Sequence, residues 1–247
     1  MLTALHQIGQ YFLLLNRVFK KPENLSLYWR QTLTEMVSLG LGSLGLIAII
    51  SFFMGAVVTL QTASNIDSPL IPDYAIGFAT RQSFILELAP TMMCLILAGK
   101  IGSNIVSEIG TMRITEQIDA YEIMGVNSAS YLILPKIVAA LMIVPLIIIY
   151  SMFLGVLGGA VVSSYSDFST MDKYLIGIRW KFTLFSIIYA LIKTLFFAFI
   201  ITSVPSFFGY YVRGGSLEIG KAATKSVVYS SIAILIINYI LTELLLM

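Results

Sequence analysis

Two charged residues lie within long apolar stretches of the sequence, where a charge is costly unless it has a partner or a function. Glu87 lies three residues before Pro90, near the start of one stretch, and Lys193 lies in the middle of another. A lysine at the centre of a bilayer costs roughly 2.5–3.5 kcal/mol on insertion scales, so Lys193 needs an acidic or carbonyl partner or an anionic ligand. Pro90 loosens its helix, and carbonyls freed at membrane depth normally line a cavity. The two charges could therefore form a structural ion pair, an ion-coupling pair or part of a ligand site.

Other motifs that could do chemistry each lack a required residue. The run GSLEIGK at 215–221 matches most of a P-loop, but Ala222 replaces the Ser or Thr that holds magnesium, and no strand precedes it. Neither an HExxH motif nor a GxSxG elbow occurs, so an intramembrane enzyme would lack its catalytic residues. The single histidine, His6, cannot form a multi-histidine metal site, and the single cysteine, Cys94, allows no internal disulfide. We therefore expect no catalytic residue, cofactor, metal or ATP site on this chain.

The composition indicates that membrane-spanning helices position these residues. Hydrophobic residues make up 58% of the 247 residues and charged residues 11%, and the mean hydropathy is +0.91. A soluble domain carries about twice that share of charge. The net charge of +2 is too small to indicate nucleic-acid binding. These values predict an all-α integral membrane protein, because strand signals are absent once the apolar runs are interpreted as spans.

Five apolar runs are long enough to cross a bilayer, which takes about 20 residues. They lie at 38–61, 83–109, 134–163, 183–207 and 226–246. The segment 65–73 holds acids but no Lys or Arg, which suits the non-cytoplasmic side, whereas 209–225 holds three cations and suits a cytoplasmic loop. This topology places the N-terminus inside the cell. It places the loop 165–181 outside, although that loop has a slight basic excess.

The first 36 residues are expected to form a separate region of interfacial amphipathic helices. An apolar stripe with helical spacing runs along residues 1–21 and includes Ile8, Phe12, Leu15 and Phe19. Such a helix is too polar to span and is typical of one that lies in the membrane interface. Pro22 breaks it, and residues 25–36 are expected to return along the surface. Residues 37–247 then form the transmembrane domain.

A polar, helix-forming segment at 97–126 separates the second run from the third. From Arg113 to Met124 it predicts a short amphipathic helix that Gly125 ends. Its apolar stripe is Ile114, Ile118 and Tyr121, and its acidic band is Glu116, Asp119 and Glu122. A membrane helix that continues into such a segment offers a soluble partner both an apolar stripe and negative charge. This is what a transmembrane subunit needs if a soluble protein is to move it.

The central segment, with its runs EIG at 108–110 and TEQ at 115–117, resembles the MlaE family of permeases. The resemblance extends over most of the chain and weakens toward the N-terminus. It implies the membrane subunit of an ABC transporter that moves lipids between the two membranes of Gram-negative bacteria. The family's permease is a homodimer. Its implied partners are an ATPase subunit that holds ATP and magnesium, a periplasmic ring of MCE-domain proteins and a small STAS-domain protein.

The resemblance also implies roles for particular residues. The coupling helix would contact the ATPase through Arg113, Glu116, Asp119, Glu122 and Met124. The lipid pocket would be lined by Val57, Val58, Gln61, Ile66, Glu87, Leu88, Lys193 and Asn238. The family's Arg-Glu-Leu-Gly-Pro pattern is Leu-Glu-Leu-Ala-Pro at 86–90, so the glutamate is kept and the arginine is not. Asn238 replaces a position that can be acidic, so a charged partner for Lys193 from the last span is not assured.

Three function classes follow from these patterns. The first is the permease subunit of an ABC transporter that moves phospholipid between the inner membrane and a periplasmic MCE protein, powered by a separate ATPase. The second is a secondary transporter that works without an ATPase and uses Glu87 and Lys193 as an ion-coupled pair. Such a transporter often has inverted repeats, which the sequence does not show. The third, an intramembrane enzyme, would require the catalytic residues that are missing.

Overall fold

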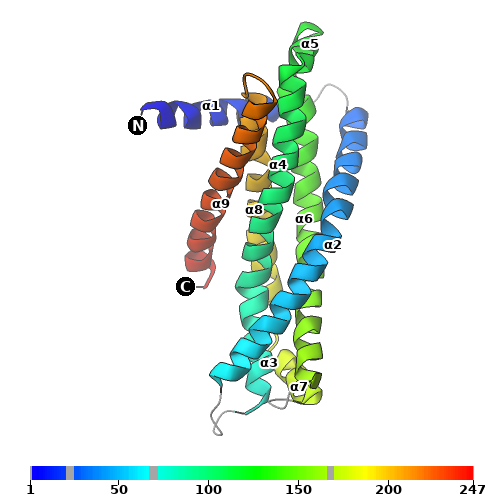
Figure 1. Ribbon diagram of the computed structural model, residues 1–247, viewed down its shortest axis with the longest axis vertical. Coiled ribbons are helices and arrows are strands. Elements are labelled where there is room, and N and C mark those ends of the chain that lie inside the picture. The colour runs from blue at the N-terminus through cyan, green and yellow to red at the C-terminus, as the bar shows by residue number, and fades with distance from the viewer. Residues whose placement is uncertain (1, 21–24, 67–71, 166–169, 247) are drawn as a thin grey trace. The chain divides into compact units, whose positions relative to one another are not determined.

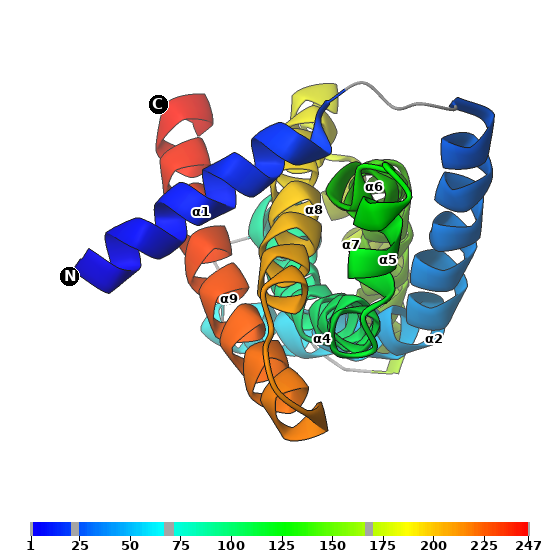
Figure 2. The same cartoon turned by 90° about the horizontal axis from the view of Figure 1, so that it is seen from above.

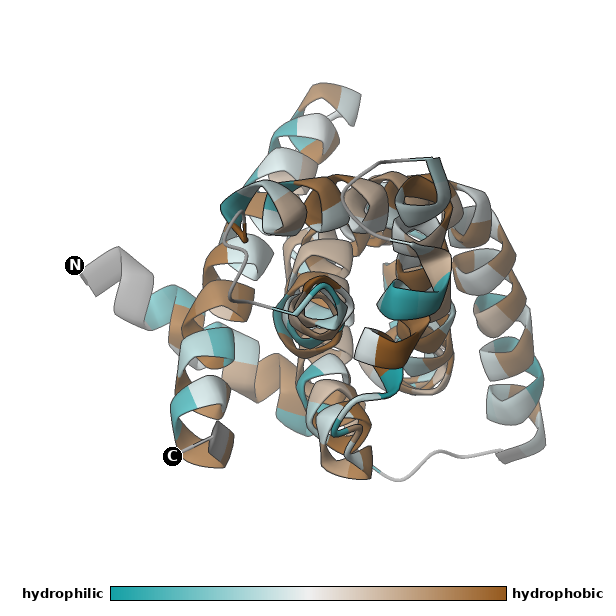
Figure 3. Cartoon of the chain, turned by 90° about the horizontal axis from the view of Figure 1, so that it is seen from below, coloured by the Kyte–Doolittle hydropathy of each residue, from teal (hydrophilic) through white to brown (hydrophobic). Residues whose placement is uncertain are grey.

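The computed structural model describes residues 2–20, 25–66, 72–165 and 170–246, and every regular element within these ranges is a helix. Five stretches are long and apolar enough to cross a membrane: Ser26–Asn65, Tyr74–Ile114, Ser128–Tyr165, Leu184–Tyr210 and Ser216–Leu245. Each of them has a window of high mean hydropathy, and hydrophobic residues, drawn in brown, are frequent on the helices in Figure 3. The chain is therefore a multi-pass, all-α integral membrane protein, as its composition predicts.

The helices contribute to two compact units of the chain. Unit 1 comprises Met1–Gly42, Leu95–Ile143 and Phe196–Ile240, and unit 2 comprises Ser43–Cys94, Val144–Leu195 and Leu241–Met247. The helices, labelled in Figure 1, are α1 (Leu2–Val18), α2 (Leu25–Asn65), α3 (Tyr74–Ser83), the π-helix η1 (Phe84–Met92), α4 (Met93–Ile114), α5 (Gln117–Ile123), α6 (Ser128–Tyr165), α7 (Met171–Arg179), α8 (Leu184–Tyr210) and α9 (Ser216–Leu246).

The helix α1 of unit 1 has two apolar faces. Leu14 and Val18 are buried, and the Tyr11 hydroxyl lies 2.8 Å from the Ser203 hydroxyl of α8. Its other face exposes the predicted stripe residues Ile8, Phe12 and Phe19 to more than half of their surface. Seen from above, α1 crosses α8 and α9 (Figure 2). One face thus packs on the protein, and the other is exposed; its contact with the membrane interface stays a prediction.

The separate surface helix predicted at residues 25–36 is not formed, because these residues are the first turns of α2. Neither proline nor glycine occurs between Leu25 and Met36, so nothing in this segment interrupts the helix. A helix of 41 residues is about 60 Å long, twice the thickness of a hydrocarbon core. The predicted break at Pro22 falls outside the described residues.

Glycines allow α2 and α6 to approach closely within unit 2. A Cβ atom added at Gly55 would overlap the backbone carbonyl of Gly155, and one added at Gly158 would overlap the carbonyl of Phe52. The buried hydroxyl of Ser51 donates to that of Ser151 at 2.8 Å along the same contact. Small residues at such spacing are typical of helix contacts in lipid, where packing drives association.

Two predicted loops contain helix instead. The loop predicted at 165–181 contains α7, which packs on α3 in unit 2. The buried guanidinium of Arg81, in α3, donates to the backbone carbonyls of Ile178 at 2.6 Å and Trp180 at 3.0 Å. These bonds satisfy carbonyls at the α7 C-terminus, which explains why a cation belongs there. In the loop predicted at 209–225, α9 begins already at Ser216.

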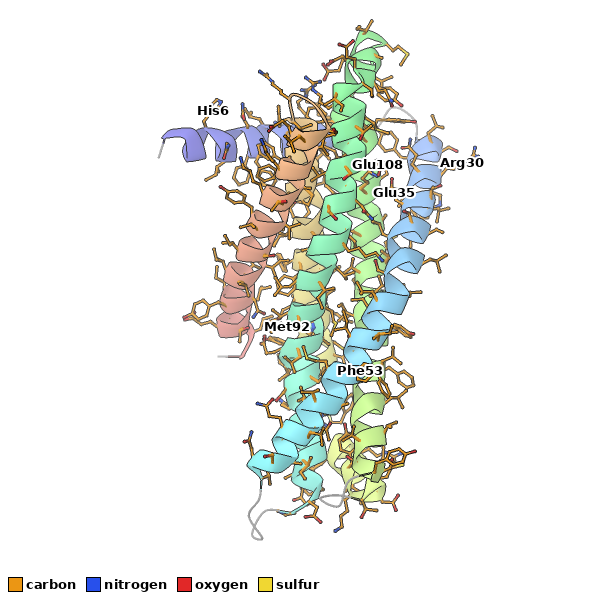
Figure 4. All side chains as sticks on the ribbon, viewed as in Figure 1. His6, Arg30, Glu35, Phe53, Met92 and Glu108 are labelled. Carbon is orange, nitrogen blue, oxygen red and sulfur yellow. The ribbon has the colours of Figure 1, made fainter. Side chains whose placement is uncertain are left out.

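A charged cluster in unit 1 joins three helices. The buried Lys136 ammonium of α6 lies 2.5 Å from Glu35 of α2 and 2.6 Å from Glu108 of α4. Glu35 and Glu108 are seen on neighbouring helices in Figure 4. Glu108, in the predicted second span, therefore has a specific partner. The cluster also explains how a buried lysine is tolerated.

Candidate functional site

The two charges predicted at membrane depth meet in unit 2. Lys193 of α8 donates to Oε1 of Glu87, in η1, at 2.6 Å. The Lys193 side chain is completely buried, whereas 39% of the Glu87 side chain is exposed. The positive charge is therefore neutralised by Glu87, whose carboxylate is the more exposed member of the pair. The structure contains the ion pair, and the ion-coupling and ligand-site alternatives stay predictions.

Hydroxyl groups complete this polar cluster. Oε1 of Glu87 also accepts from the Tyr189 hydroxyl at 3.1 Å and from the Thr242 hydroxyl at 3.3 Å, and Thr91 donates to Oε2 at 3.4 Å. The Lys193 ammonium lies 4.5 Å from the centre of the Tyr189 ring, within the range of a cation–π contact. Tyr189 is four residues from Lys193, so helical spacing could have identified it. Thr242 carried no such signal, because it lies 155 residues from Glu87.

The π-helix η1 positions Glu87. It spans Phe84–Met92 and contains Pro90, in agreement with the prediction that this proline loosens the helix. A proline has no N–H group to donate, and a π-helical turn accommodates the missing bond. π-Helical turns are frequent at functional sites, so the location of Glu87 in η1 favours a role beyond packing.

The other residues predicted to line a lipid pocket are divided between the units. Val57 and Gln61, one turn apart on α2, are exposed, and Val58 and Ile66 are partly buried. Leu88 follows Glu87 in η1 and is partly buried. These residues belong to unit 2, as do Glu87 and Lys193, whereas Asn238 belongs to unit 1. Lys193 is paired with Glu87, so its positive charge does not require an acidic residue at position 238.

The amphipathic helix predicted from Arg113 to Met124 is broken. Arg113 belongs to the last turn of α4, Glu116 adopts a left-handed conformation with φ of 60°, and α5 begins at Gln117. The side chains of Arg113 and Asp119 are bonded at 2.7 Å across this turn. The break redirects the chain, so the predicted acidic band is divided between a turn and a helix. Figure 1 shows α5 beyond the end of α4.

The predicted C-terminal end of this helix is confirmed. Gly125 has φ of +79°, its N–H group donates to the carbonyl of Glu122, and the N–H group of Val126 donates to the carbonyl of Tyr121. These two bonds form a Schellman motif, which needs a left-handed residue at this position. Glycine adopts this conformation without a steric penalty.

Glu122 of α5 contacts three other helices of unit 1. Its Oε1 atom accepts from Arg17 of α1 at 3.0 Å, from Ser128 of α6 at 3.1 Å and from Tyr210 of α8 at 3.1 Å. Burial by itself would raise the pKa of Glu122, but the bonds from Tyr210, Ser128 and Arg17 outweigh it and lower this pKa. The carboxylate thus ties α5 to the chain. Arg17 and Tyr210 had no sequence signal, since they lie far from Glu122 along the chain.

The remaining part of α5 is open to a partner. Ile118 is buried and anchors the short helix, whereas Ile123 and Met124 are exposed to 87% and 66%. Glu116 is also exposed, and Asp119 is half-buried in its pair with Arg113. Methionine is enriched in protein–protein interfaces, whose rims are polar, so these two exposed apolar side chains could serve as a contact. Met124 and Glu116 therefore remain available, whereas Glu122, although 41% of its side chain is exposed, is bonded to neighbouring helices of unit 1.

Comparison with known proteins identifies the family. Residues 32–244 match the family described as Permease MlaE. The chain belongs to the MlaE permease family. The match covers the Glu87–Lys193 cluster and α5, whereas α1 precedes it. The specific runs at 108–110 and 115–117 thus indicated the correct family.

Relatives of this MlaE-family chain carry consistent names. It is 36% identical to a probable ABC transporter permease protein of Rickettsia typhi, over 95% of this chain and 88% of the relative. It is 33% identical to a probable ABC transporter permease protein of Synechocystis, over 87% of this chain and 81% of the relative. It is 29% identical to the intermembrane phospholipid transport system permease protein MlaE of Haemophilus influenzae, over 94% of this chain and 89% of the relative.

Proposed function

We propose that this chain is the permease subunit of an ABC transporter that moves phospholipid between the inner membrane and a periplasmic MCE-domain protein. A separate ATPase binds ATP and magnesium and supplies the energy, and a STAS-domain protein accompanies it. The proposal draws on the names of the relatives, which include both an ABC permease and a phospholipid transport permease. It leaves this chain without catalytic residues of its own.

The arrangement of α5 carries the proposal. Its exposed residues Ile123 and Met124 offer a contact for the ATPase, and Glu122 links the same helix to α1, α6 and α8. A force applied to α5 would therefore reach two of the spanning helices through one carboxylate. Nucleotide binding to the partner would bias two arrangements of these helices.

The Glu87–Lys193 cluster suits the lipid end of this cycle. A phospholipid needs an apolar cavity with a few buried polar groups, and this cluster has a half-exposed carboxylate surrounded by hydroxyl donors. We assign Leu88, Val57, Val58 and Ile66 to the apolar part of that site and Gln61 to its polar part. Asn238 belongs to unit 1, and its role in lipid binding stays a prediction. The neutralised Lys193 does not by itself require an anionic headgroup.

The exposure of α9 supports a homodimer. In its most apolar stretch only 11% of the residues are buried, against 44% in α8. Large side chains such as Val228, Ile232 and Leu235 are about half exposed. A second copy of the chain could cover part of this surface, which a single subunit leaves open.

The distribution of cations supports a cytoplasmic N-terminus. Exposed cations of unit 1 flank the ends of the spans and include Arg17, Lys20, Arg30, Arg213, Lys221 and Lys225. Lys and Arg accumulate on the cytoplasmic side of inner-membrane proteins. We therefore place α1, α5 and the start of α9 on that side, and the MCE protein on the periplasmic side.

An ATPase-independent secondary transporter is the second candidate, because Glu87 and Lys193 are in direct contact. A proton or cation could be exchanged at the half-exposed carboxylate of such a pair. This candidate predicts transport by the chain alone in liposomes with an ion gradient.

Affinity purification of the tagged chain in mild detergent, with mass spectrometry of protein and lipid, separates the two candidates. Recovery of an ATPase, an MCE protein and phospholipid supports the ABC permease. Recovery of the chain alone, even after crosslinking, together with ion-driven transport, would contradict it. A variant with Glu116→Lys and Ile123→Asp is the control, since it should lose the ATPase but keep the lipid.

A further inference from the structure

An open pocket of about 400 Å³ lies in unit 1, outside the sites described above. Its walls come from α1, the C-terminal end of α8 and the first turns of α9. Gln10 contributes from α1, Phe207 and Tyr211 from the end of α8 and the turn after it, and Tyr229 from α9. The crossing of α1 over these helices can be followed in Figures 1 and 2.

The pocket has a positive charge. Arg213, Lys221 and Lys225 line it, and Glu218 is the acidic residue among its lining residues. Glu218 bonds to Lys221 at 2.6 Å, so one cation is neutralised locally. Arg213 and Lys225 are exposed and add two positive charges at the pocket. The start of α9 also lies there, and the N-terminus of a helix favours a negative charge.

The pocket is next to surfaces that suit lipid. Tyr211 and Tyr229 are 39% and 53% exposed, and tyrosine is enriched where a membrane protein meets the headgroup region. The exposed apolar face of α1, with Ile8 and Phe12, lies on the same helix as the lining residue Gln10. A basic pocket beside apolar surface on the cytoplasmic side matches the pattern that binds anionic headgroups.

We propose that this pocket binds the phosphate headgroup of an anionic phospholipid of the cytoplasmic leaflet, with Arg213 and Lys225 as the binding cations. The proposal rests on the cytoplasmic placement given above, and the site is separate from the Glu87–Lys193 cluster, which belongs to unit 2. A lipid held there would tie α1 to α9 at the membrane surface. Phosphate is the shared chemistry of a lipid headgroup and a soluble ion, and the apolar surroundings favour the lipid.

A fluorescent label in the pocket tests this proposal without interference from other lipid sites. Gln10→Cys provides the attachment point, since the native Cys94 is fully buried. The complete complex, in mild detergent, is titrated with phosphatidylglycerol that carries a spin-label quencher near its headgroup, and separately with equally labelled phosphatidylcholine. Sodium phosphate is added as a competitor.

The same titrations are made with R213Q/K225Q and with the control K20Q/R30Q, which removes two exposed cations of unit 1 outside the pocket.

The expected result is half-maximal quenching at an about 25-fold lower concentration of phosphatidylglycerol than of phosphatidylcholine, since each of the two cations contributes about a fivefold preference. R213Q/K225Q should lose this preference, and K20Q/R30Q should keep it. Equal quenching by both lipids in the unsubstituted pocket, or a preference that persists in R213Q/K225Q, overturns the proposal. Competition by millimolar phosphate would identify a soluble anion as the ligand and also overturn it.

Two controls distinguish a failure of the lipid-binding proposal from a failure of the proposed function. If R213Q/K225Q loses the ATPase while the lipid preference is unchanged, the pocket is a protein contact and the lipid proposal is wrong. If the unsubstituted chain purifies without an ATPase, the proposed function fails, but the lipid preference is still measured on the chain. Lys225→Gln alone should lower the preference part-way, which excludes misfolding of the double variant as the cause.

Discussion

The Arg17 guanidinium of α1 lies 3.0 Å from the Glu122 carboxylate of α5, and this pair joins two helices that are 105 residues apart in sequence. The same oxygen of Glu122 accepts bonds from Ser128 and Tyr210. The carboxylate is therefore a junction of four helices. A residue that resemblance assigns to the ATPase contact thus has a second role inside the subunit, as the connection through which α5 would move its neighbours.

Glu122→Gln tests this role. The amide keeps the shape but removes the charge that Arg17 needs, so we expect the ATPase to remain bound while ATP-driven lipid transfer falls about fivefold or more. Asp172→Asn is the control, because it changes an exposed carboxylate of α7 in unit 2, and it should leave coupling intact. Transfer rate per ATP hydrolysed, measured in proteoliposomes, is the readout. A normal ratio in Glu122→Gln would mean that the junction only packs α5.

The lowered pKa of Glu122 gives a pH dependence. When folding lowers the pKa of a carboxyl group, its charged form stabilises the folded protein at any pH above the pKa of the unfolded chain. For Glu122 this stabilisation is lost as the pH falls through the lowered pKa of the folded protein. The contact between α1 and α5 should therefore persist at neutral pH and through the ordinary range of a carboxylate, and open only below it. Spin labels at Asn16→Cys and Ile123→Cys report the separation of the helices by pulsed electron resonance. The same labels in Glu122→Gln should show a separation that does not change with pH, and a change in both proteins at the same pH would contradict the assignment.

Removal of the charge on Lys136 should destabilise unit 1. Lys136→Met leaves Glu35 and Glu108 without their shared cation. Their side chains are 21% and 46% exposed, so the cost should lie below the about 3–5 kcal/mol of a fully buried pair and above the less than about 1 kcal/mol of a surface pair. Lys173→Met is the control, because that lysine pairs with Asp73 at an exposed site, and such pairs are worth less than about 1 kcal/mol. Thermal unfolding in detergent measures both. Equal melting temperatures for the two variants would show that the Lys136 cluster contributes little to the stability of the folded protein.

A double-mutant cycle tests the Glu87–Lys193 pair. Lys193→Met should reduce transport more than membrane insertion, and Glu87→Gln should do the same, since each leaves an uncompensated charge or polar group. The double variant should restore much of the thermal stability, because neither charge remains unpaired. It should not restore transport if the carboxylate contacts lipid. Full transport by Lys193→Met would reduce the pair to a packing element.

The sequence was sufficient to predict the class of fold, the five spans and the pairing candidates Glu87 and Lys193, because charge in an apolar run and hydrophobic length are local signals. It did not predict the break at Glu116, since a left-handed glutamate depends on the Arg113–Asp119 bond across the turn. The bond from Tyr210 to Glu122 and the bond from Thr242 to Glu87 arise from contacts between distant segments. The charged residues at 209–225 led to the prediction of a loop, but α9 begins at Ser216. A helix that begins outside the membrane has polar first turns, which resemble a loop in the sequence.

The most direct test of the central claim is a photo-crosslinking amino acid at Met124, the exposed end of α5, in native membranes. We predict a crosslink from this position to an ATP-binding subunit. A probe at Ile176 of α7, which is 55% exposed in unit 2, should give none. A crosslink to the ATPase from position 176 but not from position 124, or from neither position in membranes that contain the ATPase, would contradict the account.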